Sequence, residues 1–349
     1  MKDLKKLVNL TGPAGFENEI ADLMFERFKK SKAVKEVKKD RIGNVYGIIP
    51  GKTQNKLMIA AHMDEVGFIV SYISDKGFMR FAPLGGYDKK ILPNSKVVFK
   101  DTKKTVKGVI GLNPPHAGGG DKVVDIKDLF IDTGYDKKEL EKLGIKLGSV
   151  AVFDTTLDEN DNVFIGKGFD DRVGCSVLLH IADNLKVKPD FTIVLAATVQ
   201  EELGLRGGEV AAKTIRPDYA LIFEGTYSMD TPGNRPDDWT SYFGQGPAFT
   251  LFDRTMAADR KYVDYVEKIA KKEKIKYQYK QPRNAGGTDA GKIHLMDNGV
   301  PCCVMAAPCR YIHSAYTLMH KDDYNAMKKL GVALCKNFKY NDLKKIYGF

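Results

Sequence analysis

The chain has 349 residues, 43% of them hydrophobic, which is ordinary for a globular protein and makes two domains a reasonable expectation. Its formal net charge is +10, but no predicted helix gathers basic residues on one face around aromatic positions, so a nucleic-acid partner is not expected. No apolar run is long enough to span a membrane, and the lysine-rich Met1–Leu10 lacks the apolar centre of a secretory signal. We therefore expect a cytoplasmic protein without a membrane partner.

The N-terminal part of the chain predicts a helix followed by three short strands. Apolar residues recur every three to four positions from Phe16 to Phe28, which indicates an amphipathic helix. Strands are predicted at residues 34–37, 44–49 and 56–59. The last of these leads into the polar sequence His62-Met63-Asp64.

The pattern of apolar residues and turns in the sequence changes between about Val66 and Val163. Short β-type runs alternate there with glycine-rich turns, which favours a small β-rich unit such as a barrel. Farther along, helices are predicted at residues 171–185, 259–272, 288–296 and 322–338, and strands at residues 191–199, 219–223 and 304–307. We therefore expect an α/β domain formed by residues 1–65 and 164–349, with residues 66–163 inserted as a β-barrel.

Polar side chains gather where the predicted strands end. His62 and Asp64 follow one strand, Gln200-Glu201-Glu202 follows a second, and Glu224 follows a third. The strand at residues 191–199 is almost wholly apolar, as in a parallel sheet covered on both faces. Because ligand sites in such sheets lie beyond the carboxyl ends of the strands, the three strand ends point to one crevice.

His62 and Asp64 project to the same side of an extended chain because they are two residues apart. The imidazole could bind a metal ion while the carboxylate orients it. For this pair alone, a histidine satisfied by a neighbouring acid is slightly favoured. His313 follows the strand at residues 304–307. By itself it is likewise a weak candidate for a metal ligand, and only the other polar residues at the strand ends make that role more favourable.

The loop Gly166–Arg172 enters a predicted helix and carries two adjacent aspartates. Asp170 could bridge two cations, since one carboxylate offers two oxygens. Asp171 could simply cap the helix. A cap needs only one acid, so the pair favours a functional role.

Glu201 and Glu202 are adjacent, and adjacent residues of an extended segment project in opposite directions. This favours separate tasks, with one carboxylate binding metal and the other facing the substrate as a general base. A glycosidase would need two carboxylates flanking one bond about 5–9 Å apart, which adjacent residues supply poorly. A solvated acidic turn is the alternative, but it is disfavoured after so apolar a strand.

The candidate donors together favour a transition-metal site. They comprise two imidazoles and three carboxylates, from His62, Asp170, Glu202, Glu224 and His313. Such a mixture suits zinc, cobalt or manganese, whereas calcium and magnesium prefer all-oxygen shells.

The other histidines are weaker candidates. His180 and His294 fall within predicted helices, and His320 precedes the helix at residues 322–338, where we expect it to be exposed. His116 lies in a glycine-rich loop of the inserted unit and could reach the site of a neighbouring subunit. The five cysteines include no CxxC pair, so reduced, buried thiols are expected, in agreement with a cytoplasmic protein.

Several motifs in a fixed order make the chain resemble the tetrahedral aminopeptidases, which include glutamyl and deblocking aminopeptidases. The matching segments extend over nearly the whole chain and are Ala61–Gly67, Gly166–Arg172, Val199–Gly207, Asp230–Gly233 and Arg310–Ser314. A set of this size is far more specific than any single motif.

The resemblance implies two divalent metal ions per subunit, zinc or cobalt, with manganese as a third candidate. The two ligand groups would share one carboxylate and are His62, Asp170 and Glu224, and Asp170, Glu202 and His313. Glu201 would be the general base and Asp64 the partner of His62. Many relatives carry aspartate at the position of Glu224, so the metal preference or ligand geometry there is open.

The resemblance also implies a phosphorylase/hydrolase-like three-layer catalytic domain with an inserted small β-barrel for dimerisation. Such subunits assemble from dimers into a tetrahedral homo-dodecamer and trim short peptides from their free amino ends. Other two-metal amidohydrolases (a carboxypeptidase, dipeptidase or deacylase), a glycan hydrolase and a peptide-binding shell without chemistry remain alternatives.

Overall fold

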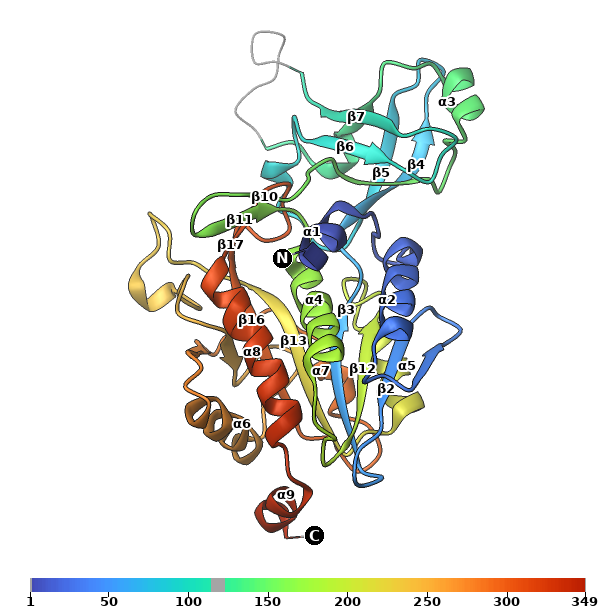
Figure 1. Ribbon diagram of the computed structural model, residues 1–349. Coiled ribbons are helices and arrows are strands. Elements are labelled where there is room, and N and C mark those ends of the chain that lie inside the picture. The colour runs from blue at the N-terminus through green and yellow to red at the C-terminus, as the bar shows by residue number, and fades with distance from the viewer. Residues whose placement is uncertain (1, 114–122, 349) are drawn as a thin grey trace.

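The computed structural model describes residues 2–113 and 123–348. An eleven-stranded mixed sheet forms the centre of the larger part, in the order β1-β2-β12-β3-β13-β16-β17-β11-β10, with β14 joined to β16 and β15 to β14 (Figure 1). Its strands are β1 (Glu36–Lys39), β2 (Val45–Ile49), β3 (Lys56–His62), β10 (Asp158–Glu159), β11 (Val163–Gly166), β12 (Thr192–Thr198), β13 (Tyr219–Tyr227), β14 (Ala248–Thr250), β15 (Gln278–Lys280), β16 (Cys302–Arg310) and β17 (Thr317–His320). The central strands β12, β3, β13 and β16 run parallel.

A closed barrel forms the smaller part, at the top of Figure 1. Its strands, in their order around the barrel, are β4 (Gly67–Ile73), β5 (Met79–Leu84), β8 (Phe130–Asp132), β7 (Val106–Gly111), β6 (Lys96–Phe99) and β9 (Val150–Phe153). An α/β fold with a small β-barrel is therefore confirmed. The exact boundaries of the inserted unit, at residues 66 and 163, stay a prediction. Near the second boundary, β10 and β11 pair within the large sheet and not within the barrel.

Helices cover both faces of the large sheet, which gives the α/β part its three layers (Figure 1). The helices are α1 (Lys2–Asn9), α2 (Asn18–Lys30), α3 (Lys137–Leu143), α4 (Phe169–Asn184), α5 (Arg206–Ile215), α6 (Arg260–Lys272), α7 (Ala290–Ile293), α8 (Lys321–Asn337) and α9 (Tyr340–Tyr347), with short 3₁₀ turns at Lys89–Ile91, Ile126–Asp128 and Pro236–Asp238. Helices α4, α6 and α8 pack on one face, and α5 and α7 pack on the other.

Strand alternation decides which residues face each helical layer. In β3, Leu57 and Ile59 belong to the core on the α4 face, whereas Met58 and Ala60 belong to the core on the α5 face. Side chains two residues apart lie on the same face of a strand. His62 therefore continues the α5 face to the carboxyl end of β3.

Two predicted elements differ from those in the structure. The predicted helix at residues 288–296 is a single turn, α7, because the chain turns directly after Ile293, and Asp297 and Gly299 have φ values of 48° and 94°, outside the helical region. The predicted strand at residues 219–223 continues to Tyr227, because β13 is hydrogen-bonded to β16 along this whole length. Glu224 consequently lies within a strand and not beyond its end.

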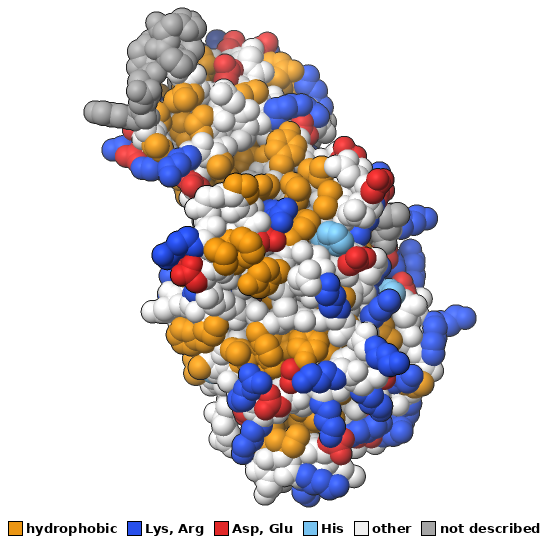
Figure 2. Space-filling model, turned by 90° about the vertical axis from the view of Figure 1, so that its left-hand side faces the viewer, with side chains coloured by type: hydrophobic (Ala, Val, Ile, Leu, Met, Phe, Trp, Pro, Cys, Tyr) orange, Lys and Arg blue, Asp and Glu red, His pale blue; other side chains and the backbone are white. Residues whose placement is uncertain are grey.

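The surface distributes charge and apolar area unevenly. Figure 2 shows hydrophobic side chains gathered where the barrel meets the α/β part, while lysine and arginine side chains crowd the lower right of the same face. In the part of the chain that the structure describes, no helix is both long and apolar enough to cross a membrane. All five cysteines are free and buried, as expected.

A buried ion cluster joins the end of β3, the start of α4 and the N-terminal helix. The Glu65 carboxylate lies 2.6 Å from Nζ of Lys167 and 3.1 Å from a terminal nitrogen of Arg172. Arg172 also donates to the carbonyl of Leu7, at the end of α1. Burial lowers the pKa of Lys167 to about 8, and the charge of Glu65 opposes that shift.

Replacing Glu65 by glutamine should destabilise the fold by about 3–5 kcal/mol, because two buried cations lose the carboxylate that pairs with both of them. Urea unfolding at fixed protein concentration measures the change. Glu209→Gln is the matched control, since Glu209 pairs with Lys213 on the surface and should contribute less than about 1 kcal/mol. Equal unfolding midpoints for the two variants would contradict a stabilising role for the buried cluster.

Candidate metal centre

The carboxylate of Asp170 contacts both predicted histidine ligands. Its Oδ1 lies 2.9 Å from Nε2 of His62, and its Oδ2 lies 3.2 Å from Nε2 of His313. Asp170 stands at the start of α4, His62 ends β3, and His313 follows β16. One carboxylate thus links residues from three separate segments.

Two further carboxylates complete the arrangement, one beside each histidine. Oε1 of Glu224 lies 3.1 Å from Nε2 of His62, and Oε1 of Glu202 lies 3.0 Å from Nε2 of His313. Oε2 of Glu201 is 4.0 Å from Nε2 of His62. The structure therefore brings all five predicted metal ligands and the predicted base into one cluster.

Asp64 holds the two glutamates as well as the histidine. Its Oδ1 and Oδ2 accept hydrogen bonds from the backbone N–H groups of Glu201 and Glu202, each at 3.0 Å, and Oδ1 lies 3.3 Å from Nδ1 of His62. From the sequence we predicted only the contact with His62. The contacts with the backbone were missed because they depend on the fold of the loop after β12.

The segment with the two glutamates is a turn, so the prediction of an extended segment is wrong. The chain bends directly after β12, and Gln200 has a φ of 54°. Such backbone is costly for a residue with a side chain. The Asp64 carboxylate stabilises the turn because it accepts hydrogen bonds from two successive backbone N–H groups. In an extended strand, successive N–H groups point in opposite directions and could not both reach one carboxylate.

Asp171 caps α4, as the sequence suggested, and it also binds the backbone of His62. Its Oδ1 accepts from the N–H of Gly174 at 2.8 Å, as a helix cap does. Its Oδ2 accepts from the backbone N–H of His62 at 3.1 Å. Asp171 therefore ties the start of α4 to the end of β3.

The barrel side of the molecule also contributes to the centre. Nδ1 of His313 lies 2.9 Å from the carbonyl oxygen of Gly86, which follows β5. A histidine that donates from Nδ1 to a carbonyl presents Nε2 as its metal-binding nitrogen. The pair Gly85-Gly86 was the only sequence signal for this contact, and Gly85 has a φ of 95°.

The crowding of acids shifts the ionisation of the whole cluster. Burial raises the pKa of Glu224, and burial likewise raises the pKa of Glu201, with the charges of neighbouring carboxylates adding to the shift. Burial alone would lower the pKa of His313, but hydrogen bonds to Asp170 and Glu202 outweigh it and raise the pKa to about 11. The carboxylates around His313 therefore favour a positive charge between them, and a bound metal cation would supply such a charge.

The other histidines that the structure describes do not belong to this cluster. His320 is the last residue of β17 and accepts from the N–H of Asp322 at the start of α8, so it is less exposed than expected. Nδ1 of His294 lies 2.8 Å from the carbonyl of Ala290. His116 lies outside the described residues.

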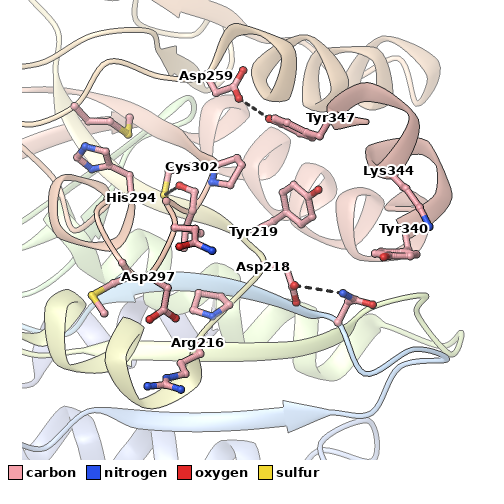
Figure 3. Close-up of a pocket in the computed structure, with 18 of the residues that line it drawn as sticks. Arg216, Asp218, Tyr219, Asp259, His294, Asp297, Cys302, Tyr340, Lys344 and Tyr347 are labelled. Atoms are coloured by element: carbon pink, nitrogen blue, oxygen red, sulfur yellow. Dashed lines mark hydrogen bonds between the residues drawn. The ribbon is translucent and has the colours of Figure 1, made fainter. Parts of the chain in front are cut away.

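A pocket of about 510 Å³ opens beside the donor cluster. Its wall includes the ligands Asp170, Glu202, Glu224 and His313 and the predicted base Glu201. A second pocket, of about 730 Å³, lies at the amino ends of β13 and β16 and contains none of these donors (Figure 3). Figure 3 shows a hydrogen bond in its wall that Tyr347 donates to Asp259, and the two oxygens are 2.7 Å apart.

Comparison with known proteins identifies the family. Residues 43–330 match the model of the M42 glutamyl aminopeptidases. The lysyl aminopeptidase of Pyrococcus furiosus is 30% identical over 346 residues, which cover 97% of this chain and 97% of that protein. The glutamyl aminopeptidase of Lactococcus lactis is 31% identical and covers 92% of this chain and 91% of its own length.

Solved structures agree with this similarity. An aminopeptidase from the archaeon Desulfurococcus kamchatkensis has a TM-score of 0.95 and 38% identity, over 100% of this chain and 97% of that one. The TET1 peptidase of Pyrococcus horikoshii has a TM-score of 0.86 and 30% identity, over 97% of this chain and 99% of that one. It can assemble into a tetrahedron or a large octahedral shell. The chain belongs to the M42 aminopeptidase family and is a peptide-bond hydrolase.

Replacing Asp64 by asparagine should lower zinc affinity by about 10- to 100-fold, because one of the two glutamate N–H groups loses its acceptor and the ligands are held less firmly. Zinc binding in competition with a chelator measures the effect. Asp161→Asn, at an exposed position, is the control and should bind zinc like the unmodified protein. Unchanged affinity in Asp64→Asn would show that the ligands keep their positions without it.

Proposed function

We propose that the chain is a two-metal aminopeptidase that removes N-terminal residues from short peptides. The observation that carries this proposal is the Asp170 carboxylate, which presents one oxygen to each of two histidines. A carboxylate with opposed partners is suited to lie between two cations. Zinc and cobalt are the preferred ions for this mixture of imidazole and carboxylate donors, with manganese as the third candidate.

The donors divide into two groups around the shared carboxylate. His62 and Glu224 would hold one ion with Asp170, and His313 and Glu202 would hold the other with Asp170. Glutamate at position 224 lies 3.1 Å from the imidazole it would accompany, so its longer side chain suits the place where many relatives have aspartate. Asp64 and Asp171 would keep His62 and the glutamate turn in position.

Glu201 is the proposed general base. Its carboxylate lines the pocket, lies 4.0 Å from Nε2 of His62, and has a raised pKa caused first by burial. The bound divalent ions would lower the pKa of a water and polarise the scissile carbonyl. Glu201 would accept the proton of the attacking water and then donate it to the leaving amine. The peptide's free α-amino group would bind among the acidic side chains of the pocket.

Rival reactions differ in the substrate end that they require. A carboxypeptidase, a dipeptidase or a deacylase could use a similar pair of ions, and relatives labelled as cellulases made a glycan hydrolase an alternative. A glycosidase needs two carboxylates that flank one bond and has no need of histidines beside them. The contacts of His62 and His313 with carboxylates therefore favour a metallopeptidase.

The barrel is the proposed dimerisation unit, and a tetrahedral homo-dodecamer is the proposed assembly. Support comes from the P. horikoshii relative, which can assemble into a tetrahedron or a large octahedral shell. The apolar side chains gathered at the junction of the barrel and the α/β part are suited to contacts between subunits (Figure 2). Free, buried cysteines agree with a cytoplasmic location.

A panel of blocked peptides tests the proposed activity. Peptides with free amino ends should be cleaved from that end, acetylated peptides should resist, and amidation of the carboxyl end should have little effect, because recognition uses the α-amino group. Chelation should abolish turnover, and zinc or cobalt should restore it at about two ions per chain. Cleavage of cellulose alone, or no cleavage by metal-loaded protein, would refute the proposal.

Replacing Glu201 by glutamine should lower kcat by about 10²- to 10⁴-fold with both metal ions retained, because the amide cannot accept a proton. Steady-state kinetics with elemental analysis of the same sample measures both quantities. Gln200→Glu is a matched exchange at the neighbouring position and should keep turnover within about threefold. Near-normal turnover in Glu201→Gln would assign the base to another residue.

A further inference from the structure

Lys280 is a buried cation in the wall of the pocket beside the metal centre. It is the last residue of β15, only 8% of its surface is exposed, and it lines the pocket with Glu224 and Tyr227. Its Nζ lies 5.0 Å from the centre of the Tyr227 ring. Among the described residues, none places a carboxylate within salt-bridge distance of this nitrogen.

Two unpaired hydroxyls lie in the same wall. Thr250 is the register partner of Lys280 in the paired strands β14 and β15, so the two residues stand side by side. Oγ1 of Thr250 and Oγ1 of Thr288 are both buried and have no hydrogen-bond partner within the described part of the chain. Buried polar groups are normally paired, so these three groups together indicate a bound polar partner.

The acids near Lys280 do not supply that partner. Burial lowers the pKa of Lys280, and Asp253 is the first of the acids that oppose this shift. Asp253 is beyond salt-bridge distance of Lys280. Its Oδ1 accepts from Thr255 and Met256, and its buried Oδ2 has no hydrogen-bond partner among the described residues, so its charge acts on Lys280 without direct contact. Glu224 acts on Lys280 only from a distance and already contacts His62.

We propose that Lys280, with Thr250 and Thr288, forms the subsite for the side chain of the substrate's N-terminal residue and selects an acidic side chain. This inference rests on the proposed aminopeptidase function. A glutamyl or aspartyl carboxylate supplies the missing counter-charge and accepts from the hydroxyls. A lysyl side chain would meet a like charge, and an apolar one would leave the ammonium unpaired.

Membership of the family does not decide this preference, because its relatives include both a lysyl and a glutamyl aminopeptidase. The competing explanation for Lys280 is structural: its charge could simply balance the acidic ligands. That role would affect every substrate alike. Selection by side chain would affect acidic substrates alone, and the two explanations are separable by kinetics.

The test compares glutamyl-, glutaminyl- and lysyl-p-nitroanilide with zinc-loaded enzyme. The unmodified protein should prefer the glutamyl substrate to its neutral isostere. Lys280→Met should lower kcat/KM for the glutamyl substrate by about 10- to 100-fold and change the glutaminyl value by less than about threefold. Lys280→Arg keeps the charge and should keep the preference. Lys261→Met removes one exposed charge on α6 and should change neither value.

Three kinetic results would overturn the assignment. They are no glutamyl preference in the unmodified protein, an equal loss for all substrates in Lys280→Met, and loss of the preference in Arg254→Met instead. Arg254 is the exposed cation of the same pocket, so its substitution separates a rim charge from the buried one.

Calorimetry separates failure of the subsite from failure of the proposed function. Zinc-loaded Glu201→Gln protein is titrated with L-glutamate and with L-glutamine, which requires no turnover. Tighter binding of glutamate, lost in the double variant with Lys280→Met, supports the subsite even if no reporter is hydrolysed. Equal binding of the two amino acids refutes the subsite even if the protein is an active aminopeptidase.

Discussion

The contact of one carboxylate with two imidazoles is the constraint on which the rest of the site depends. Asp170 lies between His62 and His313, and Nε2 of each histidine also contacts a second carboxylate, Glu224 at His62 and Glu202 at His313. Burial first, and then the charges of neighbouring carboxylates, raise the pKa values of Glu201 and Glu224, so the ionised acids are unfavourable when they stand together. The surrounding structure must therefore hold them against this repulsion.

Backbone hydrogen bonds provide much of that restraint. Asp64 accepts from two successive N–H groups of the glutamate turn, and Asp171 accepts from the N–H of His62 and from the first turn of α4. These two acids are fully buried, and they face backbone donors rather than the pocket. The fold thus uses one set of aspartates to position another set of acids.

The position of the site follows from the order of the strands. Strands β3, β12 and β13 run parallel, so the segments that follow or end them meet at one edge of the sheet. The same edge faces the barrel, which contributes the Gly86 carbonyl to His313. Strands β14 and β15, which pair with each other, add Thr250 and Lys280 to the pocket wall. The wall is therefore acidic at the ends of the parallel strands and basic at β15, within the same sheet.

The sequence by itself determined the fold class, the family and the identity of the polar residues at the strand ends. Apolar runs such as residues 191–199 and the order of the motifs are local properties, readable without a fold. Tertiary structure decided that Asp64 reaches the glutamate turn, that Glu224 lies inside β13 and that Lys280 lines the same pocket as these glutamates. These facts depend on contacts between segments more than fifty residues apart, which no local periodicity encodes.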